Sequence, residues 1–76
     1  MRLMISNLNR FTTASHVIAL LGPFGLVTSA VVMKNLKSGY SDGIALVEME
    51  YKSGQMVISE LDNSRFMNCY ISVEER

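Results

Sequence analysis

Three segments of this 76-residue chain alternate with the two-residue period of a strand, the middle one in small and large residues. The alternation covers residues 2–8, then residues from 42 or 43 to 49 or 50, then residues 70–74. Alternation predicts half-buried strands, because successive side chains on a strand point to opposite faces. A β-branched run at 26–33 predicts a further strand. We therefore expect four strands.

Two other segments show helical spacing. Apolar residues recur at helical intervals from Val17 to Phe24, which predicts a helix over roughly 13–22. Thr12 or Thr13 is the expected N-cap, and Gly22-Pro23 should end the helix. A second helix is expected over about 53–62. Residues 34–41 are rich in turn formers and predict a long hairpin loop.

The elements follow in the order βαββαβ, without an internal repeat or a linker. Right-handed crossovers then place the strands in one antiparallel sheet, in the spatial order 4-1-3-2, with both helices on one face. The predicted fold class is α+β, a ferredoxin-like sandwich in which residues 1–76 form a single domain. Leu3, Ile5, Ala45, Val47, Ile71 and Val73 should face the helices.

Composition sets further limits. The chain is 49% apolar and 18% charged, as expected of a globular domain. Its longest apolar stretch, residues 17–21, is too short to cross a bilayer, and no signal-peptide cleavage region is recognisable. We therefore expect a cytoplasmic location and no membrane contact. Cys69 is the only cysteine, so we expect no disulfide, no metal site and no cofactor.

The charges are unevenly distributed. Net charge is zero, which argues against a protein whose main task is to grip phosphates. Four bases and no acid precede Asp42, whereas seven acids and three bases lie from Asp42 onward, so the two parts carry +4 and −4. In the predicted sheet, one edge is basic and the opposite edge is acidic.

Two segments resemble the sequence signatures of the RNA-recognition motif family. They are Leu3-Met4-Ile5-Ser6-Asn7-Leu8 and Asp42-Gly43-Ile44-Ala45-Leu46-Val47-Glu48-Met49. The resemblance covers nearly the whole chain and includes the Pro23-Phe24-Gly25 turn. It implies a four-stranded platform that stacks the bases of single-stranded RNA on its open face.

The positions at which that family usually places aromatic rings hold Met4, Ile44 and Leu46 here. Asp42 stands where the family has a basic residue. Since stacking contributes ~1–3 kcal/mol per base, the absence of two or three rings should weaken binding by roughly 3–6 kcal/mol. The sequence therefore predicts weak RNA binding on an aliphatic face.

We expect RNA to contact this face and the basic 34–41 loop, which often wraps nucleic acid in the resembled family. The expected RNA-binding residues are Met4, Ile44, Leu46, Lys34, Lys37, Tyr40, Tyr70 and Arg2. The alternative is a module that docks a protein partner or a second copy, through the apolar sheet face or the first helix. An enzyme is not expected, since the chain shows no acid–base pair, no activated nucleophile and no phosphate loop.

Overall fold

The computed structural model describes residues 1–76 and has the predicted order of elements, with one addition. The strands of the main sheet are β1 (Arg2–Ser6), β2 (Val27–Lys34), β3 (Ser41–Met49) and β6 (Ser72–Glu75). The helices are α1 (Ala14–Leu21), a 3-10 turn (Gly22–Phe24) and α2 (Tyr51–Leu61). The addition is a small hairpin of β4 (Arg65–Phe66) and β5 (Cys69–Tyr70).

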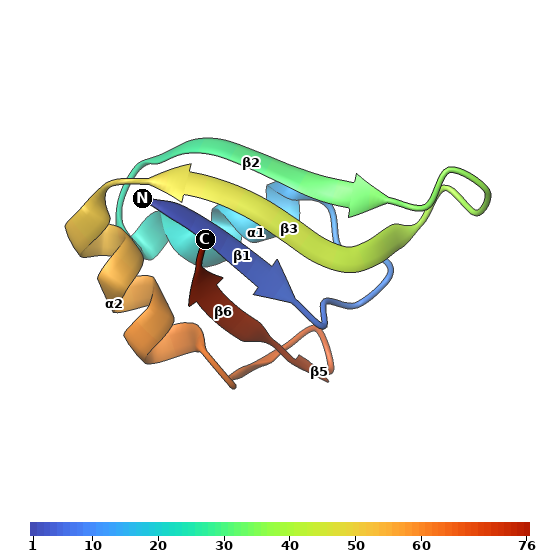
Figure 1. Ribbon diagram of the computed structural model, residues 1–76. Coiled ribbons are helices and arrows are strands. Elements are labelled where there is room, and N and C mark those ends of the chain that lie inside the picture. Colours follow the sequence, from blue (N-terminus) through green and yellow to red (C-terminus); the bar gives the residue numbers. More distant parts are fainter.

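The four-stranded sheet is antiparallel and has the order β2-β3-β1-β6, which confirms the predicted order 4-1-3-2. In Figure 1, α1 passes behind β3 and β1, α2 lies to the left of β6, and the open face of the sheet is turned toward the viewer. The ferredoxin-like α+β fold is thus confirmed. Neither helix has the length and hydrophobicity that spanning a bilayer requires.

The core lies between the sheet and the two helices. All six residues predicted to face the helices are buried: Leu3, Ile5, Ala45, Val47, Ile71 and Val73. Val17 and Leu21 of α1 and Val57 of α2 close this core from the other side. Because side chains alternate on each strand, burial of one set leaves the intervening set on the open face.

Helix α1 begins with a reciprocal cap. The His16 backbone N–H donates to Thr13 Oγ1 at 3.3 Å, and the Thr13 N–H donates to His16 Nδ1 at 3.0 Å. Two backbone donors that the helix itself leaves unpaired are satisfied in this way. Of the two predicted caps, Thr13 is therefore the one used, and His16 has a structural role there.

The first predicted strand continues to residue 8, but β1 ends at Ser6 because Asn7 has a left-handed backbone, with φ 60°. The chain then resumes pairing with β3: the Leu8 N–H donates to the Gly43 carbonyl at 3.0 Å, and the Ser41 N–H donates to the Arg10 carbonyl at 3.0 Å. A side chain at Gly43 would be strained, since its φ is 84° and a Cβ would lie 3.1 Å from the Leu8 oxygen.

The prediction for the last strand is partly wrong. Residues 70–74 were expected to form it, but β6 begins at Ser72, and Tyr70 belongs to β5, where it pairs with Arg65. The turn between β4 and β5 has φ values of 49° at Met67 and 66° at Asn68, as in a two-residue hairpin. Methionine is unusual in this conformation, so the sequence did not predict the hairpin. Helix α2 also begins two residues earlier than expected, at Tyr51.

Candidate nucleic-acid interface

The open face of the sheet has an aliphatic row at its centre. Leu46 of β3 is paired with Met4 of β1 on one side and with Val31 of β2 on the other. Met4 and Leu46 are half-buried, and Val31 is exposed over 52% of its surface. Ile44, also half-buried, lies two residues from Leu46 and therefore on the same face. Sequence reasoning placed this group correctly.

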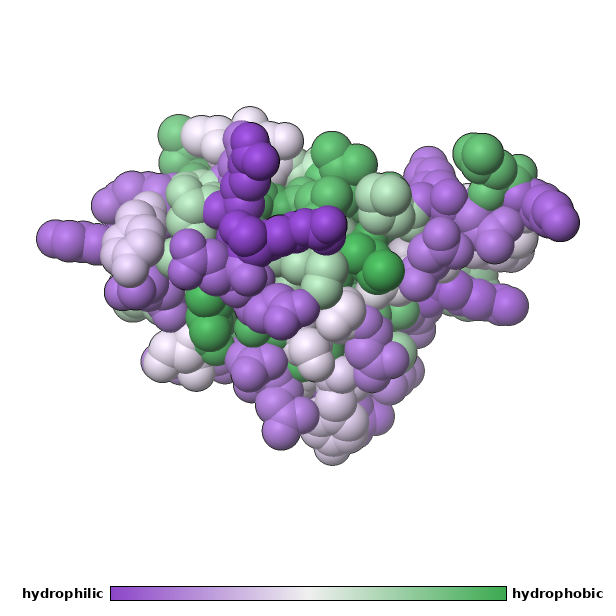
Figure 2. Space-filling model, viewed as in Figure 1, coloured by the Kyte–Doolittle hydropathy of each residue, from purple (hydrophilic) through white to green (hydrophobic).

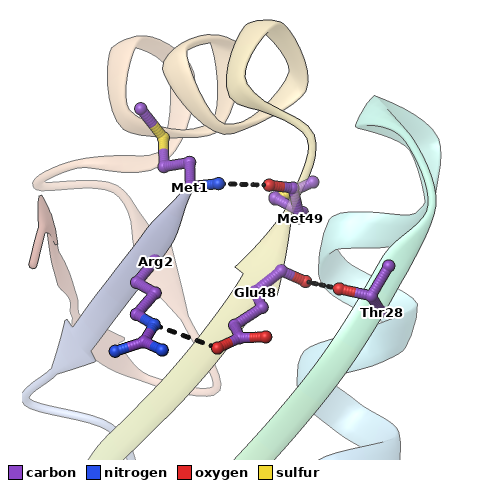
Figure 3. A network of polar contacts seen from close by, with 5 residues as sticks. All are labelled: Met1, Arg2, Thr28, Glu48 and Met49. Carbon is purple, nitrogen blue, oxygen red and sulfur yellow. Dashed lines mark hydrogen bonds and ion pairs between the residues drawn. The ribbon is translucent and has the colours of Figure 1, made fainter.

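A charged row runs beside the aliphatic one. Arg2 is paired with Glu48, which is paired in turn with Ser29 of β2. The Arg2 Nε donates to Glu48 Oε1 at 3.0 Å, as drawn in Figure 3. Both side chains are at least half exposed, so this ion pair contributes only about 0–1 kcal/mol to stability. Arg2 is thus held on the open face and remains accessible.

Backbone contacts hold the charged row in place. Thr28 is an extra residue in β2, at a register shift between Val27 and Ser29. Its hydroxyl donates to the Glu48 carbonyl at 3.0 Å, while the Met1 amino group donates to the Met49 carbonyl at 2.8 Å (Figure 3). Glu48 is therefore anchored through its main chain while its carboxylate faces Arg2.

Arg76 also lies on this face, which the sequence did not reveal. Its backbone N–H donates to the Arg2 carbonyl at 2.9 Å, and its Nη1 lies 3.4 Å from the Met4 sulfur. The two arginines border a hollow of about 350 Å³. The residues that line it are Arg2, Leu3, Ser29, Val31, Leu46, Val47, Glu48 and Arg76. Figure 2 shows strongly hydrophilic side chains lying across an otherwise hydrophobic area of this face.

The 34–41 loop extends the β2–β3 hairpin away from the sheet, at the right in Figure 1. Asn35 organises it: the Asn35 side chain accepts the N–H of Lys37 at 2.9 Å, and its backbone N–H donates to the Tyr40 carbonyl at 2.8 Å. Lys34 and Lys37 are exposed. The two predicted lysines therefore project from an ordered hairpin at one end of the sheet.

The two predicted tyrosines lie outside the four strands of the sheet: Tyr40 in the loop, as expected, and Tyr70 in the small hairpin. Tyr40 packs edge-to-face on Phe11, with ring centroids 5.3 Å apart. Tyr70 is 63% exposed, in the hairpin of β4 and β5, and its carbonyl accepts from Asn7 Nδ2 at 2.8 Å. In the sheet, the neighbour of Ser6 is instead Ser72. The placement of Tyr70 in the last strand of the sheet was wrong, because that residue belongs to the extra hairpin.

The site combines an apolar contact surface with charged groups. No cluster of three or more His, Cys, Asp or Glu side chains is positioned to hold a metal ion. The open face presents an aliphatic strip, two guanidinium groups and at least two carboxylates, Glu48 and Glu74, the latter paired with Met4. Such a surface suits a ligand that has flat apolar faces and anionic groups.

Comparison with known proteins gives the family. A model described as RNA recognition motif matches residues 3–72. The crystal structure of the RNA-binding protein PG1 is 31% identical, with a TM-score of 0.94 over 100% of this chain and 93% of that one. RNA recognition domains 1 and 2 of Sex-lethal from Drosophila melanogaster are 25% identical in sequence. Their TM-score is 0.89, over 97% of this chain and 48% of that one.

The Rna15 domain with bound RNA (GU) has a TM-score of 0.90 over 99% of this chain and 81% of that one. At 16% identity, it shows a shared fold alone. No curated protein matches the sequence significantly. The family model spans nearly the whole chain, and the sheet order and the two signature strands agree with it. This chain therefore belongs to the RNA recognition motif family.

Proposed function

We propose that this domain binds single-stranded RNA weakly, across the aliphatic face of its sheet and along the 34–41 loop. The observation that carries the proposal is the row formed by Met4, Leu46 and Val31, which stays open to solvent beside two arginines. Membership of the RNA recognition motif family and the likeness to PG1, an RNA-binding protein, support it.

Each part of the face would contribute a different interaction. Bases would lie on Met4, Ile44 and Leu46, since methionine sulfur is polarizable and aliphatic groups are readily dehydrated. The guanidinium of Arg2 would donate to phosphate or base oxygens. Affinity should be low, because aliphatic groups lack the flat π-contact of aromatic rings.

Lys34 and Lys37 would add contacts with phosphates. For single strands, each neutralised phosphate contributes a slope of about −0.7 to the dependence of log affinity on log salt concentration. Replacing both lysines with glutamine should therefore flatten that slope by about 1.4. Tyr70 is left out of the proposed surface, because it lies in β5 rather than in the sheet. The cytoplasmic location stays a prediction.

The test is a titration of isotope-labelled domain with a random pool of eight-nucleotide RNA, followed by amide chemical shifts. We expect shifts centred on Met4, Ile44, Leu46 and residues 34–41. Leu46→Glu places a carboxylate at the middle of the row and should weaken binding at least about tenfold, since it adds both repulsion and a desolvation cost. Ile18→Glu, at an exposed position of α1, is the matched control and should leave affinity unchanged.

The alternative of a protein-docking module receives no support from the relatives. It predicts a different result in the same titration: no shifts at millimolar RNA, and line broadening of the sheet face that grows with protein concentration. That result would overturn the proposal of RNA binding.

A further inference from the structure

An arginine and two aromatic rings meet outside the sheet, at the end from which the 34–41 loop extends. The Phe11 and Tyr40 rings are perpendicular, at 87°, with centroids 5.3 Å apart. The Arg10 guanidinium carbon lies 4.9 Å from the Phe11 centroid and 5.0 Å from the Tyr40 centroid. One cation is therefore shared by two rings from segments thirty residues apart in the sequence.

Hydrogen bonds hold these segments together. The Asn9 side chain accepts the Phe11 N–H at 2.8 Å and donates to the Met67 carbonyl at 3.0 Å. The Arg10 carbonyl accepts the Ser41 N–H at 3.0 Å, next to Tyr40. The rings thus stand on a backbone that is fixed on both sides, so a ligand would not have to order it first.

The rings are not buried in the core. Phe11 remains 53% exposed and Tyr40 44% exposed. Two other tyrosines are also exposed, Tyr51 on α2 and Tyr70 in β5, but neither stacks on another ring or on a cation. Phe24 and Phe66 pack against the core. The chain therefore places its one exposed pair of π-surfaces at the Arg10 cluster.

The cluster lies in line with the proposed RNA surface. Tyr40 directly precedes β3, and its neighbour Ser41 is about 10 Å from Ile44 along that strand. Lys34 is paired with Ser41, and Lys37 lies in the adjoining loop. Asp42 is the one acid next to the cluster in sequence. Cations with exposed rings are the combination that binds an unpaired base and its phosphate.

We propose that Arg10, Phe11 and Tyr40 form a second base-binding site, separate from the sheet face, which takes one unpaired nucleobase of single-stranded RNA by stacking. This inference rests on the proposed RNA binding and locates its aromatic component. Stacking uses the π-face that every base has, so the site accepts all four bases. The sheet then provides aliphatic surface against which bases are buried, and the cluster provides the aromatic stacking that the sheet lacks.

The test compares ring removal with ring replacement, using a fluorescent random pool of eight-nucleotide RNA and anisotropy. Phe11→Leu and Tyr40→Leu should each weaken binding about five- to hundredfold. Phe11→Tyr keeps a ring and should remain within about twofold, and Tyr51→Leu removes an exposed ring elsewhere and should change nothing. Amide spectra of each variant establish that the fold is kept.

A second measurement needs no variant. RNA carrying 5-iodouridine is irradiated in complex with the unaltered domain, and the crosslinked peptide is identified by mass spectrometry. A crosslink at Phe11 or Tyr40 supports the site. RNA binding with sheet-face shifts, unchanged affinity in both leucine variants and no crosslink there would overturn this inference alone. An unaltered domain that binds no RNA would overturn the proposed function and this inference together.

Discussion

Placing one ring at the centre of the sheet should strengthen RNA binding. Leu46→Phe puts a phenyl group where the family usually has an aromatic residue, between Met4 and Val31 in the cross-strand row. The hollow of about 350 Å³ beside Leu46 leaves room for the ring. Since the position faces away from the core, we expect stability to change by less than about 1 kcal/mol.

The expected gain follows from what leucine already provides. A base at position 46 buries apolar area against leucine as well as against phenylalanine. The free energy of burying that area therefore largely cancels in the comparison. The remaining difference is the part of an aromatic contact that exceeds its buried area, about 0.5–1.5 kcal/mol. That range corresponds to an affinity about two- to twelvefold higher.

The assay is fluorescence anisotropy with the random eight-nucleotide pool at fixed salt concentration. Ile18→Phe adds the same ring on the exposed side of α1 and should leave affinity as it is. The reasoning would be refuted if Leu46→Phe kept its fold, by amide spectra, and bound RNA no better than the unaltered domain. Bases would then not lie on the middle of β3.

Three further changes test the surface charge and the backbone. Glu48→Gln removes the carboxylate facing Arg2 and should raise RNA affinity about two- to fivefold at low salt, whereas Glu60→Gln, with the same change in net charge on α2, should not. Gly43→Ala should cost about 1–3 kcal/mol in urea unfolding, and more than Gly39→Ala, because Gly39 has a φ of 77° but no atom near its Cβ position. Thr13→Ala should cost about 1 kcal/mol through loss of the cap, and Thr13→Ser should restore it in the same measurement. Equal losses in the two glycine variants, or in the two threonine variants, would contradict the corresponding contact.

Much of the fold could be predicted because the pattern and the turn chemistry agree. The two-residue period of a strand around Leu3 and Val47, together with the matched family motifs, assigns one face to the core, and a slip of one residue would expose all of it. Gly22-Pro23 marks the end of α1, where proline removes a backbone donor. The central part of the site followed from the same alternation, which put Met4 and Leu46 together.

The small hairpin and the Arg10 cluster could not be predicted, because they depend on contacts that the periodicity of the sequence does not encode. The hairpin of β4 and β5 needs left-handed backbone at Met67, which the residue type does not suggest. The meeting of Arg10, Phe11 and Tyr40 arises from loop pairing beyond Asn7, whose backbone is left-handed. The one sign of this cluster in the sequence was a phenylalanine in the loop before α1. Its role became clear only because the structure shows it exposed and in contact with Tyr40.

The central claim is that RNA lies on an aliphatic sheet, and methyl groups allow it to be observed directly. Selective methyl labelling of methionine, isoleucine and leucine, with isotope-filtered NOE spectra on the RNA complex, reports which side chains touch the bases. We predict NOEs from base protons to the methyl groups of Met4, Ile44 and Leu46. NOEs confined to residues of α1 and α2, in a complex with saturated RNA binding, would contradict the account.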